Sequence, residues 1–288
     1  MKPFEYLAPS SLEEALDMLG DHGGDAMIMA GGTDLIPLLS DRKVAPEYVI
    51  HIDKLDELRY IKEEQDHIRI GPLVTMNEII GSDLICNKLS ALWQAAGSSG
   101  APQVRNLGTI GGNLGTASPA GDMTLALIAL GAKVNVASKD GVGQYAVEDF
   151  LTGTKKNALS NNQMITEIIV PALPANTGSG FRKHGKRKGV VIAFASVAAV
   201  VTVDAATNTI LSAKIAMGAL APTPVVSKKY GAAIVGLPAD STQIKTLSEL
   251  VKSEIAPRTG RATSEYRSEI ACVLAAGCVK DCLDNLKQ

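Results

Sequence analysis

The sequence predicts an α+β protein of two domains. With 288 residues, the chain is long enough to bury a large core and more readily holds two domains than one. In the first half, short apolar runs alternate with helix-start signals, whereas in the second half three strand-like runs precede two helical segments. Residues 172–180, rich in proline, glycine and polar side chains, are the predicted linker between the halves.

The chain opens with a predicted helix and a predicted strand. Ser11 and Glu14 form a capping box before leucines at helical spacing, and residues 26–30 are an apolar run of strand length. A glycine pair then leads into an apolar helix start at residues 35–39. A strand that turns through glycine into a helix directs backbone N–H groups and the positive end of the helix dipole at an anion. The turn matches neither a P-loop nor G-x-G-x-x-G, so the sequence disfavours a nucleoside triphosphatase and a Rossmann site.

A second glycine-rich stretch lies at residues 103–122, between predicted helices at 89–96 and 123–130. Its five glycines and small hydroxyl residues are typical of a phosphate-binding loop, although such clusters also form plain tight turns. Asp122 stands where it could cap the helix that follows. Two anion-facing loops in one domain favour the diphosphate of a dinucleotide over a single phosphate. Further strands are predicted at residues 48–52, 68–70, 133–137 and 164–170.

The second half has a different pattern. Residues 181–186, 190–203 and 210–217 are predicted as three consecutive strands, and helices are predicted at 242–255 and 264–286. Short polar connections between consecutive strands are typical of an antiparallel sheet. The second domain is therefore predicted as a small antiparallel sheet followed by helices.

Composition limits the possible partners and compartments. The net charge of −2 and the absence of a basic stripe argue against nucleic acid as a partner. Four cysteines, with none between Cys86 and Cys272, match no disulfide framework or cluster motif, so we expect no iron–sulfur or other metal centre in this chain. The first six residues include an acid and a proline, and no later apolar run reaches spanning length. We therefore expect a cytoplasmic protein that has no membrane partner.

The glycine-rich motifs carry a family resemblance. Residues 30–35, 103–113 and 117–122 resemble the FAD-binding subunit of the molybdenum hydroxylases, a family that includes xanthine dehydrogenase, molybdenum-type carbon monoxide dehydrogenase and nicotinate dehydrogenase. The resemblance to the flavoprotein C-terminal domain of these subunits rests on residues 181–188, 218–224 and 264–267. Several ordered motifs at matching intervals extend the likeness over the whole chain.

The resemblance implies a fold and domain boundaries. The first domain, residues 1–175, is expected to be a two-lobed FAD-binding domain of the vanillyl-alcohol-oxidase-like (PCMH) type. Its first lobe is expected at residues 1–55 and its second at 56–175. The small antiparallel sheet with helices is expected to form the C-terminal domain at residues 176–288.

The resemblance also implies which residues bind the cofactor. Both glycine loops would wrap the FAD diphosphate, Asp122 would contact the cofactor, Ile165 would line the flavin pocket, and the Lys183 cation would stabilise negative charge on reduced flavin. Asp122 could instead only cap its helix, and Lys183 could be a solvated strand residue. No catalytic acid or base is nominated, and Ser99 stands where animal xanthine oxidases place an aromatic residue near the flavin. The implied cofactor-binding residues are Met29, Ala30, Gly31, Gly32, Thr33, Asp34, Leu35, Thr109, Ile110, Gly111, Gly112, Asn113, Asp122, Ile165 and Lys183.

The resemblance finally implies a function. A large subunit with a molybdopterin cofactor would hydroxylate a substrate, and two 2Fe-2S centres in a small subunit would pass the electrons to the FAD of this chain. The flavin would reduce NAD(P)+ or another acceptor, in a dimer of heterotrimers. A free-standing FAD oxidoreductase of the same fold is one alternative, although no substrate acid is evident beside the second loop. A structural subunit with an empty flavin site is another, and the intact glycine loops count against it.

Overall fold

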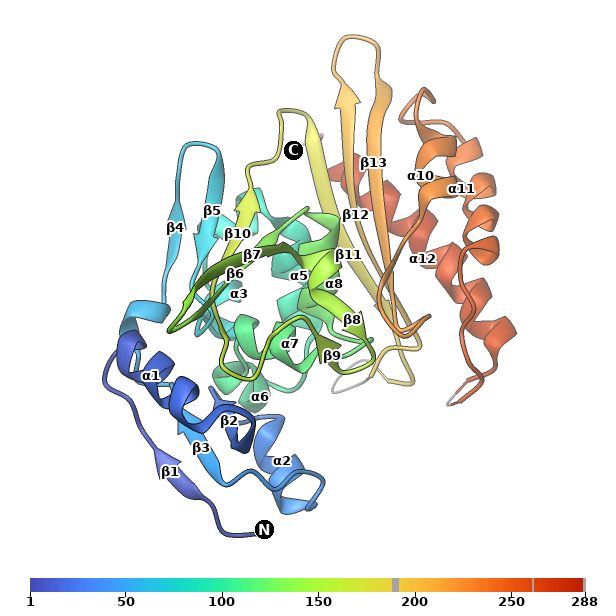
Figure 1. Ribbon diagram of the computed structural model, residues 1–288. Helices are drawn as coiled ribbons and strands as arrows, with labels where there is room; N and C mark the ends of the chain where they lie inside the picture. Colours follow the sequence, from blue (N-terminus) through green and yellow to red (C-terminus); the bar gives the residue numbers. More distant parts are fainter. Residues whose placement is uncertain (188–191, 261, 287–288) are drawn as a thin grey trace.

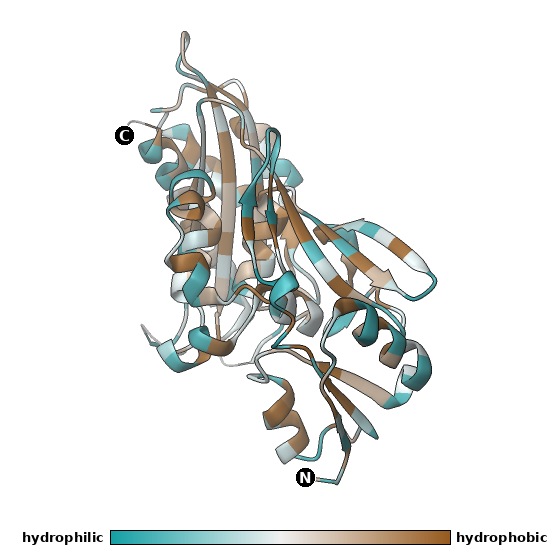
Figure 2. Cartoon of the chain, turned by 90° about the vertical axis from the view of Figure 1, so that its left-hand side faces the viewer, coloured by the Kyte–Doolittle hydropathy of each residue, from teal (hydrophilic) through white to brown (hydrophobic). Residues whose placement is uncertain are grey.

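The structure, a computed structural model, describes residues 1–187, 192–260 and 262–286 (Figure 1). Three main β-sheets follow one another along the chain, and helices separate and cover them. Apolar residues follow the long strands, whereas polar residues gather at hairpin turns and helix ends (Figure 2). In this described part of the chain, no helix is both long and apolar enough to cross a membrane.

The first sheet is small and parallel. Its strands are β1 (Glu5–Leu7), β2 (Ala26–Met29) and β3 (Tyr48–His51), in the order β1-β3-β2. Helix α1 (Leu12–His22) starts where the sequence predicts, because Ser11 Oγ accepts the Glu14 N–H. The capping box is not reciprocal, since the Glu14 carboxylate accepts from the Ser10 N–H and hydroxyl instead. The complete capping box lies at Thr75.

The second sheet is antiparallel, with the order β4-β5-β10-β6-β7. Its strands are β4 (Ile61–Glu63), β5 (His67–Ile70), β6 (Lys133–Ser138), β7 (Gly141–Ala146) and β10 (Met164–Pro171). Helix α8 (Asp122–Ala129) is buried along its whole length, because it lies in one hydrophobic cluster with this sheet and also packs against the C-terminal sheet. Helix α2 (Leu35–Ser40) packs with β3 in the first lobe. The other elements of the first half are α3 (Met76–Ile80), α4 (Asp83–Lys88), α5 (Ser90–Ser98), α6 (Pro102–Leu107), α7 (Ile110–Thr116), α9 (Val147–Phe150), β8 (Leu151–Gly153) and β9 (Lys156–Asn157).

The C-terminal sheet lies between two sets of helices. Strands β11 (Thr177–His184), β12 (Ala195–Asp204), β13 (Thr209–Gly218) and β14 (Val225–Val226) form an antiparallel sheet in chain order. Helices α5 and α8 pack against it, and α12 (Ser264–Asn285) packs against β11 and β12 with its buried cysteines in a separate hydrophobic cluster (Figure 1). The remaining helices are α10 (Lys228–Ile234), α11 (Gln243–Leu247) and the 3₁₀ helix η3 (Ser248–Ser253).

The three predicted strands of the second half are confirmed, but one predicted helix is wrong. Strand β12 begins at Ala195, five residues after the predicted start, and residues 188–191 lie outside the described part. The helix predicted at residues 242–255 is instead α11 followed by the 3₁₀ helix η3. Ser248 Oγ donates to the carbonyl of Lys245, a local bond that competes with regular helical pairing.

The predicted linker is also wrong in part, because residues 177–180 are strand residues of β11. A Cβ atom at Gly178 would lie 2.0 Å from the carbonyl oxygen of Cys282, and one at Gly180 would lie 3.5 Å from its Sγ. These glycines therefore allow the last turns of α12 to pack directly on the strand backbone. Only residues 172–176 connect β10 to β11.

A polar network crosses the second sheet around Glu167, which lies beside a β-bulge. Its carboxylate accepts from the Tyr60 hydroxyl at 2.6 Å, from Arg69 Nη2 at 2.5 Å and from Asn135 Nδ2 at 2.9 Å. Burial, together with the hydrogen bond and negative charge of Glu167, raises the pKa of Tyr60 to about 12. The network joins strands that are far apart in the chain.

The raised pKa of the Tyr60 hydroxyl makes the free energy of unfolding fall at alkaline pH. Its folded pKa of about 12 exceeds the ordinary value of 10.0, so the stability that it contributes is complete below pH 10 and is lost as the pH rises through 12. We therefore expect the wild type to lose more stability between pH 10 and pH 12 than Tyr60→Phe does. Urea unfolding at a series of pH values measures this difference, and equal losses would contradict it.

Candidate functional site

The first glycine loop connects β2 to α2 and presses against the second lobe. A Cβ atom at Gly31 would lie only 1.7 Å from the carbonyl oxygen of Leu107, the last residue of α6. Gly32 has a φ of +68°, and a Cβ atom there would meet the side chain of Ile36 at 2.8 Å. Only glycine allows this backbone contact and this turn. The loop is fixed further by Thr116 Oγ1, which donates to Asp34 Oδ2 at 3.0 Å.

The backbone N–H groups of this loop are not used in hydrogen bonds within the described part of the chain. Within the described residues, the N–H groups of residues 31–35 have no hydrogen-bond acceptor, and the first paired amide is that of Ile36, which donates to the Gly32 carbonyl. Leu35 is the first residue of α2, so these amides lie at the helix N-terminus. Successive unpaired amides at this end of a helix favour phosphate binding. The sequence prediction of strand, glycine turn and helix is confirmed here.

The second loop differs, because the amides of residues 110–113 are paired inside the chain. Thr109 is the N-cap of α7, and its Oγ1 accepts the Gly112 N–H at 3.0 Å while its carbonyl accepts the Asn113 N–H. The Gly111 N–H donates to the Pro72 carbonyl at 2.9 Å, and a Cβ atom there would meet Pro72 at 2.6 Å. Gly111 is thus required for packing, whereas Gly112 is exposed.

Asp122 and Lys183 meet in a buried ion pair. Lys183 Nζ lies 2.5 Å from Asp122 Oδ2, and their side chains are 9% and 5% exposed. Asp122 makes no capping hydrogen bond although it opens α8, and Lys183 is not solvated, so neither of the two alternative interpretations describes these residues. Ser99 Oγ also donates to Asp122 Oδ2, at 3.2 Å, and Lys183 Nζ donates to the Ser98 carbonyl at 3.3 Å.

The other carboxylate oxygen of Asp122 is buried with no hydrogen-bond partner among the described residues. Burial raises the pKa of the Asp122 carboxyl, and it outweighs the opposite effect of the Lys183 cation. A buried acceptor without a donor is costly, so the site suits a ligand that offers an N–H or O–H group to Oδ1.

Two further predicted residues, Ile165 and Met29, are apolar. Ile165 is 7% exposed and lies in the same hydrophobic cluster as Ile110 of α7. Met29 packs beside Leu35 in a small cluster of the first lobe. The structure therefore brings the first loop against α6 and Asp122 against Lys183. Ile165 belongs to the hydrophobic core of the second lobe, and Met29 to that of the first lobe.

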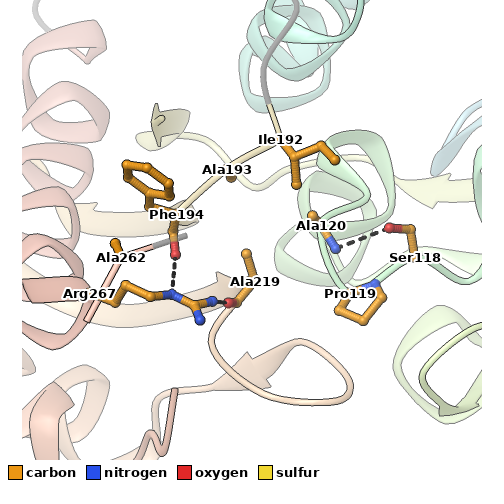
Figure 3. A pocket seen from close by; sticks show the side chains of 9 residues that line it. All are labelled: Ser118, Pro119, Ala120, Ile192, Ala193, Phe194, Ala219, Ala262 and Arg267. Carbon is orange, nitrogen blue, oxygen red and sulfur yellow. Dashed lines mark hydrogen bonds between the residues drawn. The ribbon is translucent and has the colours of Figure 1, made fainter. Parts of the chain in front are cut away.

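A cavity of about 290 Å³ lies between the loop that precedes Asp122 and the start of β12 (Figure 3). Arg267 lies on its wall and donates through Nε to the Phe194 carbonyl at 3.0 Å and through Nη2 to the Ala219 carbonyl. The Ala219 N–H in turn donates to the Pro119 carbonyl at 2.7 Å. Residues 264–267 contribute to the family resemblance, but Arg267 is not among the residues that it implies for cofactor binding. Burial lowers the pKa of this guanidinium.

Sequence reasoning missed a second, larger cavity of about 740 Å³ in the C-terminal half. It lies between α11 and α12, where the apolar side chains of Ile244 and Leu283 are accompanied by charged side chains such as Arg182 and Lys280. No sequence motif indicates it, because it forms between elements that are distant in the chain.

Comparison with protein families decides the identity. Residues 2–173 match the family model described as FAD binding domain in molybdopterin dehydrogenase. The chain belongs to this family. Residues 181–281 match the CO dehydrogenase flavoprotein C-terminal domain. The sequence predictions of the family, the α+β fold and FAD as the cofactor are thereby confirmed.

Individual relatives agree with this membership. The chain is 39% identical over 242 residues to the nicotinate dehydrogenase FAD-subunit of Eubacterium barkeri, covering 83% of this chain and 81% of the relative. It is 30% identical over 272 residues to the carbon monoxide dehydrogenase medium chain of Afipia carboxidovorans, covering 94% and 93%. The solved carbon monoxide dehydrogenase of Hydrogenophaga pseudoflava includes a chain that superposes with a TM-score of 0.93, at 30% identity and 99% coverage of both chains. The chain is therefore an FAD-binding oxidoreductase subunit of the molybdenum hydroxylase family.

Because the ion pair is buried, we expect removal of one partner to lower the free energy of unfolding strongly. Lys183→Met leaves the Asp122 carboxylate buried without its cation, and we expect a stability loss of about 3 to 5 kcal/mol. The double variant Asp122→Asn, Lys183→Met removes both charges and should recover most of this loss. Urea unfolding monitored by circular dichroism measures the free energy of unfolding of the wild type, of Lys183→Met and of the double variant.

The exposed pair of Lys43 and Asp41, whose side chains are 64% and 58% exposed, provides the matched control. Lys43→Met should cost at most about 1 kcal/mol. A Lys183→Met protein as stable as the Lys43→Met protein would contradict the burial of the Asp122 pair.

Proposed function

We propose that this chain binds FAD between its two glycine loops and the Asp122–Lys183 pair, and that it is the electron-transfer subunit of a three-component molybdenum hydroxylase. The observation that carries this proposal is the run of five amides at residues 31–35 that have no acceptor among the described residues, in a loop held against α6 by the close contact of Gly31. A diphosphate needs hydrogen-bond donors of this kind. A side chain at Gly31 would clash with the Leu107 backbone and push the two lobes apart. The residues present therefore fit FAD.

Each part of the site has its own task in this proposal. The amides of residues 31–35 and the N-terminus of α2 hold the diphosphate, and the exposed backbone around Gly112 covers it from the other side. The Asp122 Oδ1 atom accepts a hydrogen bond from the cofactor, and Lys183 supplies a fixed positive charge. Ile165 and Met29 supply apolar walls. Bound FAD provides the exchange of one or two electrons, so no protein acid or base is assigned.

The partners complete the proposal. An iron–sulfur small subunit delivers electrons from a molybdenum large subunit with a molybdopterin cofactor, and a dimer of heterotrimers is the proposed assembly. The names of the relatives support a division among subunits, since one is a medium chain and another an FAD-subunit.

The proposed location is the cytoplasm, which the four free thiols among the described residues support. The proposed domains are residues 1–175, with lobes 1–55 and 56–175, and residues 176–288, close to the extents of the two matched family models.

The acceptor in this proposal is NAD(P)+ or another electron acceptor. Support for NAD(P)+ comes from the 290 Å³ cavity, which lies beside the loop leading into Asp122 and has the Arg267 cation on its wall. In the complex purified with its partner chains, we expect NADH or NADPH to bleach the flavin absorbance band. Failure of both nucleotides to do so would exclude this acceptor and leave the FAD assignment intact.

A bulky side chain at Gly112 tests FAD binding. Gly112 is exposed, and the described atom nearest to a Cβ there is Thr109 Oγ1 at 3.0 Å, so Gly112→Leu requires a small shift of this one side chain and obstructs the proposed diphosphate position. We expect reconstituted Gly112→Leu protein to lose stoichiometric FAD, measured by its visible spectrum after gel filtration. Gly97→Leu is the matched control, because Gly97 is exposed and has no described atom within 4 Å of its Cβ position. Normal FAD content in Gly112→Leu would overturn the placement.

A further inference from the structure

Arg105 is a half-buried cation to which the proposed site gives no task. Its Nη1 donates to the carbonyls of Ser99 and Gly100, at 3.2 and 3.3 Å. Its Nε is buried and has no hydrogen-bond partner among the described residues. None of the ion pairs in the described part of the chain includes Arg105, so its charge is not neutralised by a carboxylate.

The two carbonyls that Arg105 binds belong to a sharp turn at the end of α5. Gly100 has a φ of +53°, and a Cβ atom there would lie 2.9 Å from Val104 Cγ1, so the turn requires glycine. The preceding carbonyl, that of Ser98, accepts from Lys183 Nζ at 3.3 Å. Three successive carbonyls at the negative end of a helix are therefore bound by two cations, one from α6 and one from β11.

The same turn includes Ser99, whose hydroxyl is a hydrogen-bond donor to Asp122. Ser99 is 5% exposed, and the single proton of its hydroxyl faces two acceptors, the Ala95 carbonyl at 2.9 Å and Asp122 Oδ2 at 3.2 Å from Oγ. Moving the Ser99 backbone would therefore move the hydroxyl that orients the Asp122 carboxylate. Because α6 also ends at Leu107, against which the first glycine loop packs, Arg105 connects the diphosphate end of the site to its charged end.

We propose that Arg105 is a positioning residue for the flavin. It fixes the Ser99–Gly100 turn, and through this turn it sets the Asp122–Lys183 pair relative to the glycine loops. Its uncompensated charge adds to that of Lys183, so the flavin is held in a more positive environment than Lys183 and Asp122 would provide alone. This inference rests on the proposed FAD site, and it concerns the geometry and charge of that site rather than its existence.

Arg105→Gln tests the inference in the FAD-loaded chain. The substitution removes the charge and one pair of charge-assisted hydrogen bonds, so we expect the FAD dissociation constant to rise roughly tenfold or more. We also expect a shift of the visible flavin spectrum and a more negative flavin midpoint potential, which a loss of folding stability alone would not produce. Arg105→Lys keeps the charge and should recover part of all three quantities.

Arg258→Gln, which removes an exposed arginine, is the control and should leave all three quantities unchanged. If Arg105→Gln has the affinity, spectrum and potential of the wild type, or if Arg105→Lys recovers nothing, the inference is wrong. Retention of FAD by Gly112→Leu would instead remove the proposed site itself, so the two failures are distinguishable.

Discussion

A buried ion pair between Asp122 and Lys183 joins the two halves of this chain. Asp122 opens α8, which lies between the second and C-terminal sheets, and Lys183 stands near the end of β11. Removing both charges from water is expensive, and the hydrogen bonds from Ser99 and to the Ser98 carbonyl compensate only in part, since Asp122 Oδ1 has no partner in the described chain. A site that leaves a buried acceptor open is typical of a binding role rather than of stability alone.

The two glycine loops are not equivalent, although both are glycine pairs in the sequence. Residues 31–35, at the start of α2, have amides without an acceptor in the described chain, whereas the amides of residues 110–113 donate to neighbouring residues of the second lobe and fix the start of α7. In the proposed function, the first loop therefore supplies most of the backbone donors to the diphosphate. The second loop instead provides a surface without side chains, because Gly111 packs on Pro72 and Gly112 is exposed.

Much of the fold, and part of the site, could be predicted from the sequence. Local signals succeeded, such as the N-cap at Ser11, the strand and helix on either side of Gly31, and the three strands of the C-terminal sheet. Contacts that depend on packing between distant segments were not predictable. The pairing of Asp122 with Lys183 depends on how α8 packs against the C-terminal sheet. Gly178 resembled a linker residue because its neighbour, Cys282, is more than one hundred residues away in the sequence. Arg105 was visible in a motif, but only the structure shows which carbonyls it binds.

Hydrogen–deuterium exchange with and without FAD tests the central claim most directly, because it reports on individual backbone amides. The account predicts that the amides of residues 31–35 exchange rapidly in the free chain and become protected when FAD is added, since they have no acceptor within the described chain. The amides of residues 110–113 should be protected in both states, because each already has an acceptor. Unchanged exchange at residues 31–35 in protein that has bound FAD would contradict the assignment of this loop to the diphosphate.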